Sequence, residues 1–327
     1  MSDLFRVTHL SKQFPLQSSF LDVLFAGGRR QVVHAVDDIC FEIREGEVLG
    51  LAGESGSGKS TKGRLLLRLL EPTSGHIEYR GRDLTVIPRR EMEGLRGKLQ
   101  VVFQDPNSSL SPRMSVGQAI GHPLAVHGVG SPWERRERVL ELMQRIGLTP
   151  ADFLYRKYPH QLSGGQCQRV VLARALITSP EFIVADEPIA MADVSVRALI
   201  LELMKRLKEE FRLTYLFITH DLATAKYLCD RIAIMYLGRI VELGSRDQLF
   251  ARPHHPYTRA LLEAVPIPDP SQRRSHEVVR GEIPSAIDPP AGCHFHPRCP
   301  FVMDKCRQAR PPMKEVAPGH LSACLLD

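Results

Sequence analysis

The stretch GESGSGKST, Gly53 to Thr61, decides the fold. It follows EVLGLA, an apolar run typical of a buried parallel strand, and it precedes KGRLLLRLL, which is typical of a helix. A glycine-rich turn between a strand and a helix is the context of a phosphate-binding loop. The glycines at 53, 56 and 58 let the backbone fold tightly and turn its N–H groups toward phosphate oxygens. The stretch therefore predicts nucleotide binding.

The helix that begins at Lys59 directs the positive end of its dipole at the same spot. Lys59 is expected to reach the β- and γ-phosphates, and the Ser60 hydroxyl to ligate Mg²⁺. A glycine-rich surface turn is the alternative, and the strand and helix on either side argue against it. The loop residues expected to bind nucleotide are Gly53, Ser55, Gly56, Gly58, Lys59, Ser60 and Thr61.

The composition is that of a globular protein, with 327 residues, 43% hydrophobic and 24% charged. No stretch approaches the roughly 18 consecutive apolar residues of a spanning helix. The N-terminal MSDLFRVTHL lacks the layout of a secretory signal, so we expect a cytoplasmic protein with only indirect membrane contact. A net charge of +6 fits an anionic partner such as nucleotide. Because basic residues are dispersed along the chain, a nucleic-acid surface is the weaker interpretation.

Strand and helix patterns alternate along most of the chain. FIVADEP and LTYLFITHD are continuous apolar strands, and SPWERRERVLELMQRIGL is a helix with Ser131 as its N-cap and Gly147 as its stop. This alternation predicts an α/β fold with a parallel sheet covered on both faces. The alternation of strand and helix patterns ends near Phe250, where a Pro-, Arg- and Asp-rich segment and the cysteine cluster follow. We therefore predict a nucleotide-binding domain over 1–250 and an extension over 251–327.

Several strands end in polar side chains. Asp186 and Glu187 follow FIVA; Asp186 would hold Mg²⁺ through water, and Glu187 would polarise a water for attack on the γ-phosphate. Gln104 ends KLQVVFQD and could reach the Mg²⁺ or the attacking water. His220 ends LFITH and could contact the γ-phosphate. Taken alone, the Asp186-Glu187 strand end could equally be structural, and a lone Gln104 or His220 is more often structural than functional.

The segment LSGGQ, Leu162 to Gln166, resembles a second anion site. Ser163 would cap the following helix, and the two glycines would free backbone donors for an anion. Since the chain already has a phosphate loop, a second such helix start implies a nucleotide bound between two subunits. The residues assigned to this contact are Ser163, Gly164, Gly165 and Gln166.

In this order, GESGSGKST, FQDP, LSGGQ, FIVADEP and ITHD resemble the ATP-binding cassette of ABC transporters. The segments QDPNSSLSPRMSVG and HHPYTRALL and the terminal cysteines resemble, more narrowly, the ATPase subunits of peptide/nickel importers for dipeptides and oligopeptides. The resemblance implies a P-loop NTPase fold. It would have a RecA-like parallel core, an antiparallel β edge, a helical subdomain at about 105–165 and a small Cys-rich C-terminal extension.

The resemblance also implies an assembly. Two cassettes would sandwich two ATP-Mg, each between residues 53–61 of one chain and 163–166 of the other. The partner would be a second, different ABC ATPase, giving a heterodimer. Two transmembrane permease subunits would sense the motion through a groove near Gln104 and the segment 106–160, and an extracytoplasmic solute-binding protein would deliver cargo. The chain would be peripheral, on the cytoplasmic face of the inner membrane, and Phe14 would stack on adenine.

The sequence departs from the family at two places. The turn Ala190-Met191-Ala192-Asp193 lacks the usual hydroxyl, and Cys167 stands where arginine or lysine is common. Neither change touches the hydrolytic groups, so we expect an active ATPase. A soluble ABC ATPase acting on nucleic acid or ribosomes is the alternative; it usually has two cassettes or a long coiled coil. A non-hydrolysing regulatory cassette is disfavoured because Glu187, Gln104 and His220 are all present.

Four of the seven cysteines crowd into the last 35 residues, which in a reducing compartment favours metal over disulfides. Zinc sites favour cysteine pairs two to four residues apart, which are absent here. A four-thiolate cluster tolerates wider spacing, and the resemblance supports [4Fe–4S]; Zn²⁺ and free thiols remain alternatives. The four residues are Cys293, Cys299, Cys306 and Cys324. The transported substrate is not predicted by the sequence.

Overall fold

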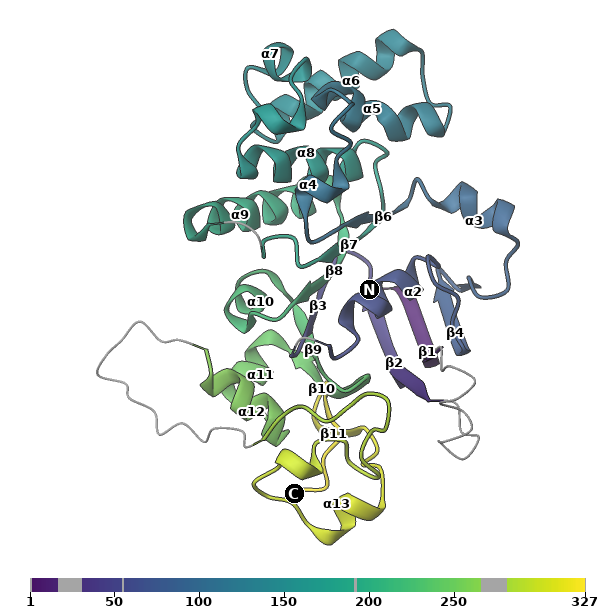
Figure 1. Ribbon diagram of the computed structural model, residues 1–327, viewed down its shortest axis with the longest axis vertical. Helices are drawn as coiled ribbons and strands as arrows, with labels where there is room; N and C mark the ends of the chain where they lie inside the picture. The colour runs from purple at the N-terminus through teal and green to yellow at the C-terminus, as the bar shows by residue number, and fades with distance from the viewer. Residues whose placement is uncertain (1, 17–30, 55, 191–192, 266–280, 327) are drawn as a thin grey trace. The chain divides into compact units, whose positions relative to one another are not determined.

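The computed structural model describes residues 2–16, 31–54, 56–190, 193–265 and 281–326 (Figure 1). The chain divides into two compact units. The first contains residues 1–44, 48–86 and 218–327, and the second contains residues 45–47 and 87–217. No helix in the described part of the chain is both long enough and apolar enough to cross a membrane.

The first unit contains an antiparallel sheet of β1 (Asp3–Pro15), β2 (Val32–Arg44), β4 (Ser74–Tyr79) and β5 (Arg82–Asp83). The strands lie in the order β2-β1-β4-β5. Phe5, Val7 and Leu10 of β1 are buried, which gives this sheet one apolar face. It is the antiparallel β edge that the family resemblance implies.

A second sheet in this unit has the order β11-β12-β10-β9-β3. Strand β3 is buried at all five positions and runs parallel to β9, as expected for a continuous apolar run. The strands are β3 (Val48–Ala52), β9 (Arg231–Tyr236), β10 (Arg239–Ser245), β11 (Lys314–Ala317) and β12 (His320–Ser322). The helices of the unit include α2 (Lys59–Leu66), α10 (Leu222–Leu228), α11 (Arg246–Ala251), α12 (Pro256–Glu263) and α13 (Asp304–Gln308).

The C-terminal segment joins this second sheet. Strand β12 pairs with β10, with Ser322 opposite Glu242 and Leu321 opposite Leu243. The sequence patterns did not predict these strands, because β11 and β12 span only four and three residues. The extension is therefore continuous with the sheet that contains β3, the strand before the phosphate loop.

The second unit contains the parallel strands β6 (Leu99–Val102) and β7 (Phe182–Asp186), followed in strand order by β8 (Thr214–Thr219). The predicted N-cap at Ser131 is confirmed by a capping box with Glu134, and Gly147 has the left-handed φ of 72° that suits a helix stop. Helix α5 contacts α6, α7 and α8. The helices are α3 (Arg89–Leu95), α4 (Pro106–Ser109), α5 (Val116–Val126), α6 (Pro132–Arg145), α7 (Ala151–Tyr155), α8 (Gly164–Leu176) and α9 (Val194–Phe211).

Candidate functional site

The phosphate loop connects β3 to α2 in the first unit, as predicted. Its three glycines have positive φ values, 152° at Gly53, 79° at Gly56 and 90° at Gly58. A Cβ atom at Gly58 would lie 2.0 Å from the Ala35 carbonyl oxygen, and one at Gly53 would lie 2.3 Å from the Met235 carbonyl oxygen. At these two positions glycine is therefore required both by conformation and by space.

Lys59 lies inside the curve of this loop. Its buried ammonium donates to the carbonyl oxygens of Gly53, at 2.7 Å, and Glu54, at 2.8 Å. The exposed Ser60 and the half-buried Thr61 follow in the first turn of α2, and Ser55 lies outside the described residues. The loop thus places a cation where a phosphate would be bound by backbone donors.

The acidic end of β7 belongs to the second unit. Asp186 is buried, and Glu187 follows it with a left-handed φ of 47°. A non-glycine residue in this conformation costs roughly 1 to 3 kcal/mol, and such strain is concentrated at functional sites. Gln104 lies two residues beyond the end of β6, and its Nε2 donates to Glu187 Oε2 at 2.9 Å. The structure therefore brings together two predicted site residues that are distant in sequence.

The SGGQ segment forms the N-terminus of α8. Ser163 Oγ accepts from the Gln166 N–H, and Gln166 Oε1 accepts from the Ser163 N–H at 3.0 Å, so the predicted cap is confirmed. Gly164 faces open space. Cys167, one of the two departures from the family pattern, is buried, and its thiol donates to the Pro159 carbonyl; burial raises its pKa, which makes it unreactive.

The two remaining predicted site residues are His220 and Phe14. His220 is exposed just after β8 and belongs to the first unit. Phe14 lies near the end of β1, opposite Val33, with the Lys12 ammonium 5.1 Å from its ring centroid. The second departure from the family pattern is the turn after Pro188. Two of its residues, Met191 and Ala192, lie outside the described residues.

The four C-terminal cysteines line one small apolar pocket of about 10 Å³, together with Phe295 and Leu326. Burial, together with a smaller effect of the three neighbouring cysteines, raises the pKa of Cys293 to about 11. Burial also raises the pKa of Cys299 and Cys324. Across the described ranges, no group of three or more His, Cys, Asp or Glu side chains has the arrangement of a metal site. The four thiols line the same pocket, and the raised pKa values favour the protonated form of Cys293, Cys299 and Cys324.

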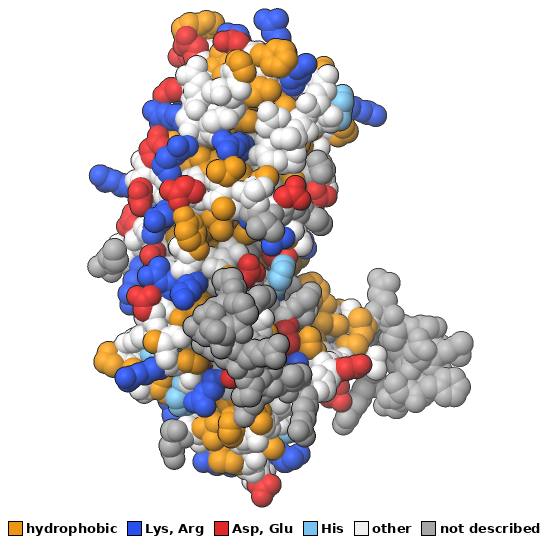
Figure 2. Space-filling model, turned by 90° about the vertical axis from the view of Figure 1, so that its left-hand side faces the viewer, with side chains coloured by type: hydrophobic (Ala, Val, Ile, Leu, Met, Phe, Trp, Pro, Cys, Tyr) orange, Lys and Arg blue, Asp and Glu red, His pale blue; other side chains and the backbone are white. Residues whose placement is uncertain are grey.

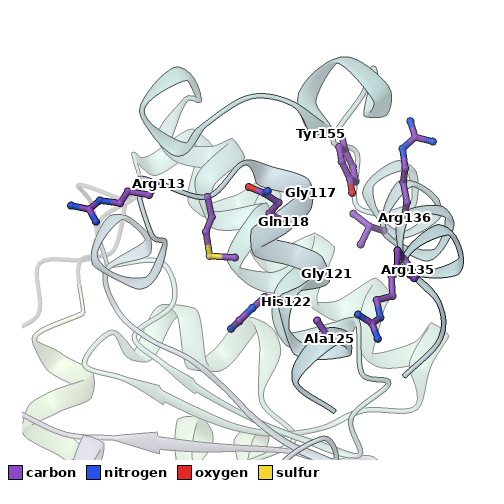
Figure 3. A pocket seen from close by; sticks show the side chains of 12 residues that line it. Arg113, Gly117, Gln118, Gly121, His122, Ala125, Arg135, Arg136 and Tyr155 are labelled. Atoms are coloured by element: carbon purple, nitrogen blue, oxygen red, sulfur yellow. The ribbon is translucent and has the colours of Figure 1, made fainter. Parts of the chain in front are cut away.

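A larger pocket of about 450 Å³ lies among α5, α6 and α7 in the second unit. Figure 3 shows Arg113 on one side of it and Arg135 and Arg136 on the opposite side. A Cβ atom at Gly117 would lie 2.3 Å from the Tyr155 ring, so glycine there lets α7 approach α5 closely. The rim of this pocket is basic.

Sequence reasoning missed two sets of contacts made by the C-terminal segment. The Arg298 guanidinium pairs with the Glu54 carboxylate, and the Tyr257 hydroxyl accepts from the Glu54 N–H. The buried carboxylate of Glu242 accepts from three donors of the C-terminal segment. The order HHPY around Tyr257 and the arginine next to Cys299 were visible in the sequence, but their partners were not.

A phosphate loop with a buried lysine and an acidic strand end beside a glutamine define the class of P-loop ATPases. Comparison with known proteins narrows the class. Residues 36–190 match the family described as ABC transporter, and residues 241–306 match the one described as oligopeptide/dipeptide transporter, C-terminal region.

Individual relatives extend these matches over the whole chain. A Brucella ovis protein named for peptide import and ATP binding is 46% identical over 99% of this chain and 98% of its own length. The oligopeptide transport ATP-binding protein AppF of Bacillus subtilis is 44% identical over 97% of this chain and 95% of its own. The solved dimer of the ATP-binding cassette MJ0796 with ADP and Pi has a TM-score of 0.64 and 29% identity, covering 74% of this chain and 98% of that one. The chain belongs to the ATP-binding subunits of peptide-type ABC transporters and is an ATPase with the ABC cassette fold.

Proposed function

We propose that this protein is the energy-coupling ATPase of an importer for dipeptides, oligopeptides or related solutes. The observation that carries the proposal is the presence in one chain of the cassette match and the oligopeptide/dipeptide C-terminal match. The proposed division of labour is a nucleotide-binding domain over 1–250 and a family-specific extension over 251–327. The importer proposal is supported by relatives named for peptide import or oligopeptide transport, which align over nearly the full chain.

The proposed chemistry follows from the groups at the two strand ends. Glu187 acts as the base that polarises the attacking water. Gln104 Nε2 donates a hydrogen bond to the Glu187 carboxylate at 2.9 Å and so orients it. Lys59 and the loop N–H groups bind the β- and γ-phosphates, while Ser163, Gly164, Gly165 and Gln166 contact the nucleotide of the partner cassette. Phe14 stacks on adenine, and His220 contacts the γ-phosphate.

Mg²⁺ is the metal that this reaction class uses, and the donor set fits it, since hydroxyl and carboxylate oxygens are the ligands it prefers. Ser60, Asp186 and Gln104 are the proposed ligands. When bound, the ion neutralises charge on the phosphate oxygens. Ser60 belongs to the first unit and Asp186 to the second, so a site formed by both is part of the proposal.

We assign the four-cysteine pocket to a [4Fe–4S] cluster, with Zn²⁺ as the alternative. The donor chemistry fits a thiolate-bound metal, because four thiols from one segment of the chain line the same pocket. The pocket would have to expand and release protons for a cluster to bind, since its volume is small and burial favours the protonated form of Cys293, Cys299 and Cys324. Anaerobic purification with iron, sulfide and zinc analysis tests the assignment; one zinc per chain without iron contradicts it.

The proposed partners are a second, different ATPase subunit, two permease subunits and an extracytoplasmic binding protein, at the inner face of the membrane. The pocket among α5, α6 and α7 is the proposed permease contact. Its arginines favour a segment that offers carboxylates or the carbonyl end of a helix.

The alternative is a soluble ABC ATPase acting on nucleic acid or ribosomes. On the face drawn in Figure 2, lysine and arginine side chains are interspersed with acidic ones instead of forming a basic stripe. Affinity purification of the tagged chain from its own membranes distinguishes the two functions. Two multi-spanning proteins and a second cassette are expected by mass spectrometry; ribosomal or DNA-repair proteins without a membrane subunit would overturn the importer proposal.

A further inference from the structure

An arginine of the C-terminal extension contacts the phosphate loop directly. Arg298 Nη1 donates to Glu54 Oε2 at 2.8 Å, and Nη2 donates to Oε1 at 3.1 Å. The Arg298 side chain is only 8% exposed, and the Glu54 side chain is 27% exposed. A bidentate pair that is largely withdrawn from water is stronger and more specific than an exposed ion pair. Glu54 is the second residue of the loop.

Glu54 is held at its backbone as well as at its carboxylate. Its N–H donates to the Tyr257 hydroxyl at 2.9 Å, and its carbonyl oxygen accepts from the Lys59 ammonium at 2.8 Å. Movement of Glu54 would therefore displace the lysine that is expected to bind the phosphates. Glu54 therefore links Arg298 to Lys59, the side chain expected to bind the phosphates.

Aromatic packing fixes the position of Arg298. Its guanidinium lies 5.8 Å from the Tyr236 ring centroid, and the rings of Tyr236, Tyr257 and Phe295 pack with centroids 4.8 to 5.4 Å apart. Arg298 ends a 3-10 turn that begins at His296 and is followed by Cys299. The guanidinium is thus held in place before it binds Glu54, which reduces the entropy lost on pairing.

The loop has little room to adjust if this contact is lost. At Gly53 a Cβ atom would already collide with the Met235 carbonyl oxygen, and the Ser57 carbonyl accepts from the Gly238 N–H at 3.1 Å. The loop is therefore packed against β9 and the β9–β10 turn, and it is also held by the extension through Glu54. A change at Glu54 alters the direction of the phosphate-binding donors instead of being absorbed locally.

We propose that Arg298 is a positioning residue for ATP binding, and that through Glu54 the C-terminal extension holds the phosphate loop in its nucleotide-binding shape. Loss of the pair weakens nucleotide affinity by roughly tenfold, the effect of one charge-assisted hydrogen bond. The four-cysteine pocket, which adjoins Arg298 in sequence, is then placed to influence the ATP site.

The test measures binding of a non-hydrolysable ATP analogue with Mg²⁺ to the full chain by titration calorimetry. The variants are Arg298→Ala, Arg298→Lys, Glu54→Gln and the double variant Arg298→Ala with Glu54→Gln. Each single change is expected to weaken binding, Arg298→Lys less than Arg298→Ala, and the double variant should be no weaker than the worse single variant. Arg310→Ala is the matched control, because Arg310 belongs to the extension but pairs at 3.4 Å with Asp37, outside the loop.

Glu54→Gln keeps the test decisive if Arg298→Ala fails to fold, since it leaves the extension unchanged. The proposal is overturned if Glu54→Gln and Arg298→Lys both bind the analogue within about twofold of the unaltered protein. It is also overturned if the effects of the two positions simply multiply in the double variant, because independent sites add in free energy. A fall in melting temperature without a change in affinity would assign the pair a purely structural role and refute the proposal as well.

Discussion

Replacing Glu242 with glutamine should loosen the C-terminal segment from the sheet. Glu242 lies on β10 and is fully buried. Its Oε1 accepts from the His254 N–H at 2.7 Å and lies 2.7 Å from His320 Nε2, and its Oε2 accepts from the His255 N–H at 2.9 Å. One carboxylate therefore joins β10 to the residues before α12 and to the first residue of β12.

The size of the effect follows from counting acceptors. An amide offers one oxygen, so in either orientation at least one of the three donors faces an NH₂ group. Losing a hydrogen bond to a charged acceptor and leaving the donor buried costs about 2 to 4 kcal/mol. Local opening of the segment should become roughly 30 to 1,000 times more frequent, since about 1.4 kcal/mol is tenfold.

Hydrogen exchange measured by mass spectrometry reports this opening, because two compact units make a single unfolding free energy ill-defined. Peptides from β11, β12 and the start of α12 should lose protection, while peptides from β1 should not change. Glu315→Gln is the control, since Glu315 is exposed and accepts one bond, from the Gly319 N–H at 2.7 Å. Unchanged protection of β12 in Glu242→Gln would refute the reasoning.

Three further outcomes are expected. Glu187→Gln should lower the ATPase rate by roughly 100- to 10,000-fold with analogue affinity unchanged, because the amide cannot accept the proton; unchanged turnover would contradict the base assignment. Burial lowers the pKa of His255 to about 3, so its contribution to stability is full above about pH 6.5 and is lost as the pH falls toward 3, by about 5 kcal/mol. His255→Asn should flatten the decline of melting temperature with acid; an equal slope contradicts this. Because burial raises the pKa of Cys293, metal loading should increase from pH 6.5 to 8.5 and fall in Cys293→Ser, and pH-independent loading would argue against thiolate ligands.

The phosphate loop and the helix caps could be predicted because each is determined by one short stretch of sequence. The glycine conformations at Gly53 and Gly58, and the capping box at Ser163, depend on neighbours within a few residues. The approach of Gln104 to Glu187 is longer in range, yet it was foreseeable, because both residues follow strands whose ends meet at one edge of a parallel sheet. Boundaries were less accurate; β6 ends at Val102 and not at Gln104.

The contacts of the extension could not be predicted in the same way. Arg298 and Glu54 lie 244 residues apart, and His320 and Glu242 lie 78 apart, with no periodic pattern linking either pair. A charged residue gives no sequence signal of burial, because most arginines and glutamates are exposed. Only the fold, which pairs β12 with β10, makes these side chains neighbours.

The Glu242 contacts and the Arg298–Glu54 pair are linked through strands β9 and β10. Glu242 fixes the extension to β10, which pairs with β9, and the turn after β9 supports the phosphate loop through the bond from Gly238 to Ser57. Arg298 contacts the same loop through Glu54. If Glu242 is lost, the segment with Arg298 should also be less well held, so Glu242→Gln and Arg298→Ala should couple in nucleotide affinity although the residues do not share a bond. Such coupling would be expected if the extension contributes to ATP binding and not only to its own folding, and independent effects on affinity would contradict it.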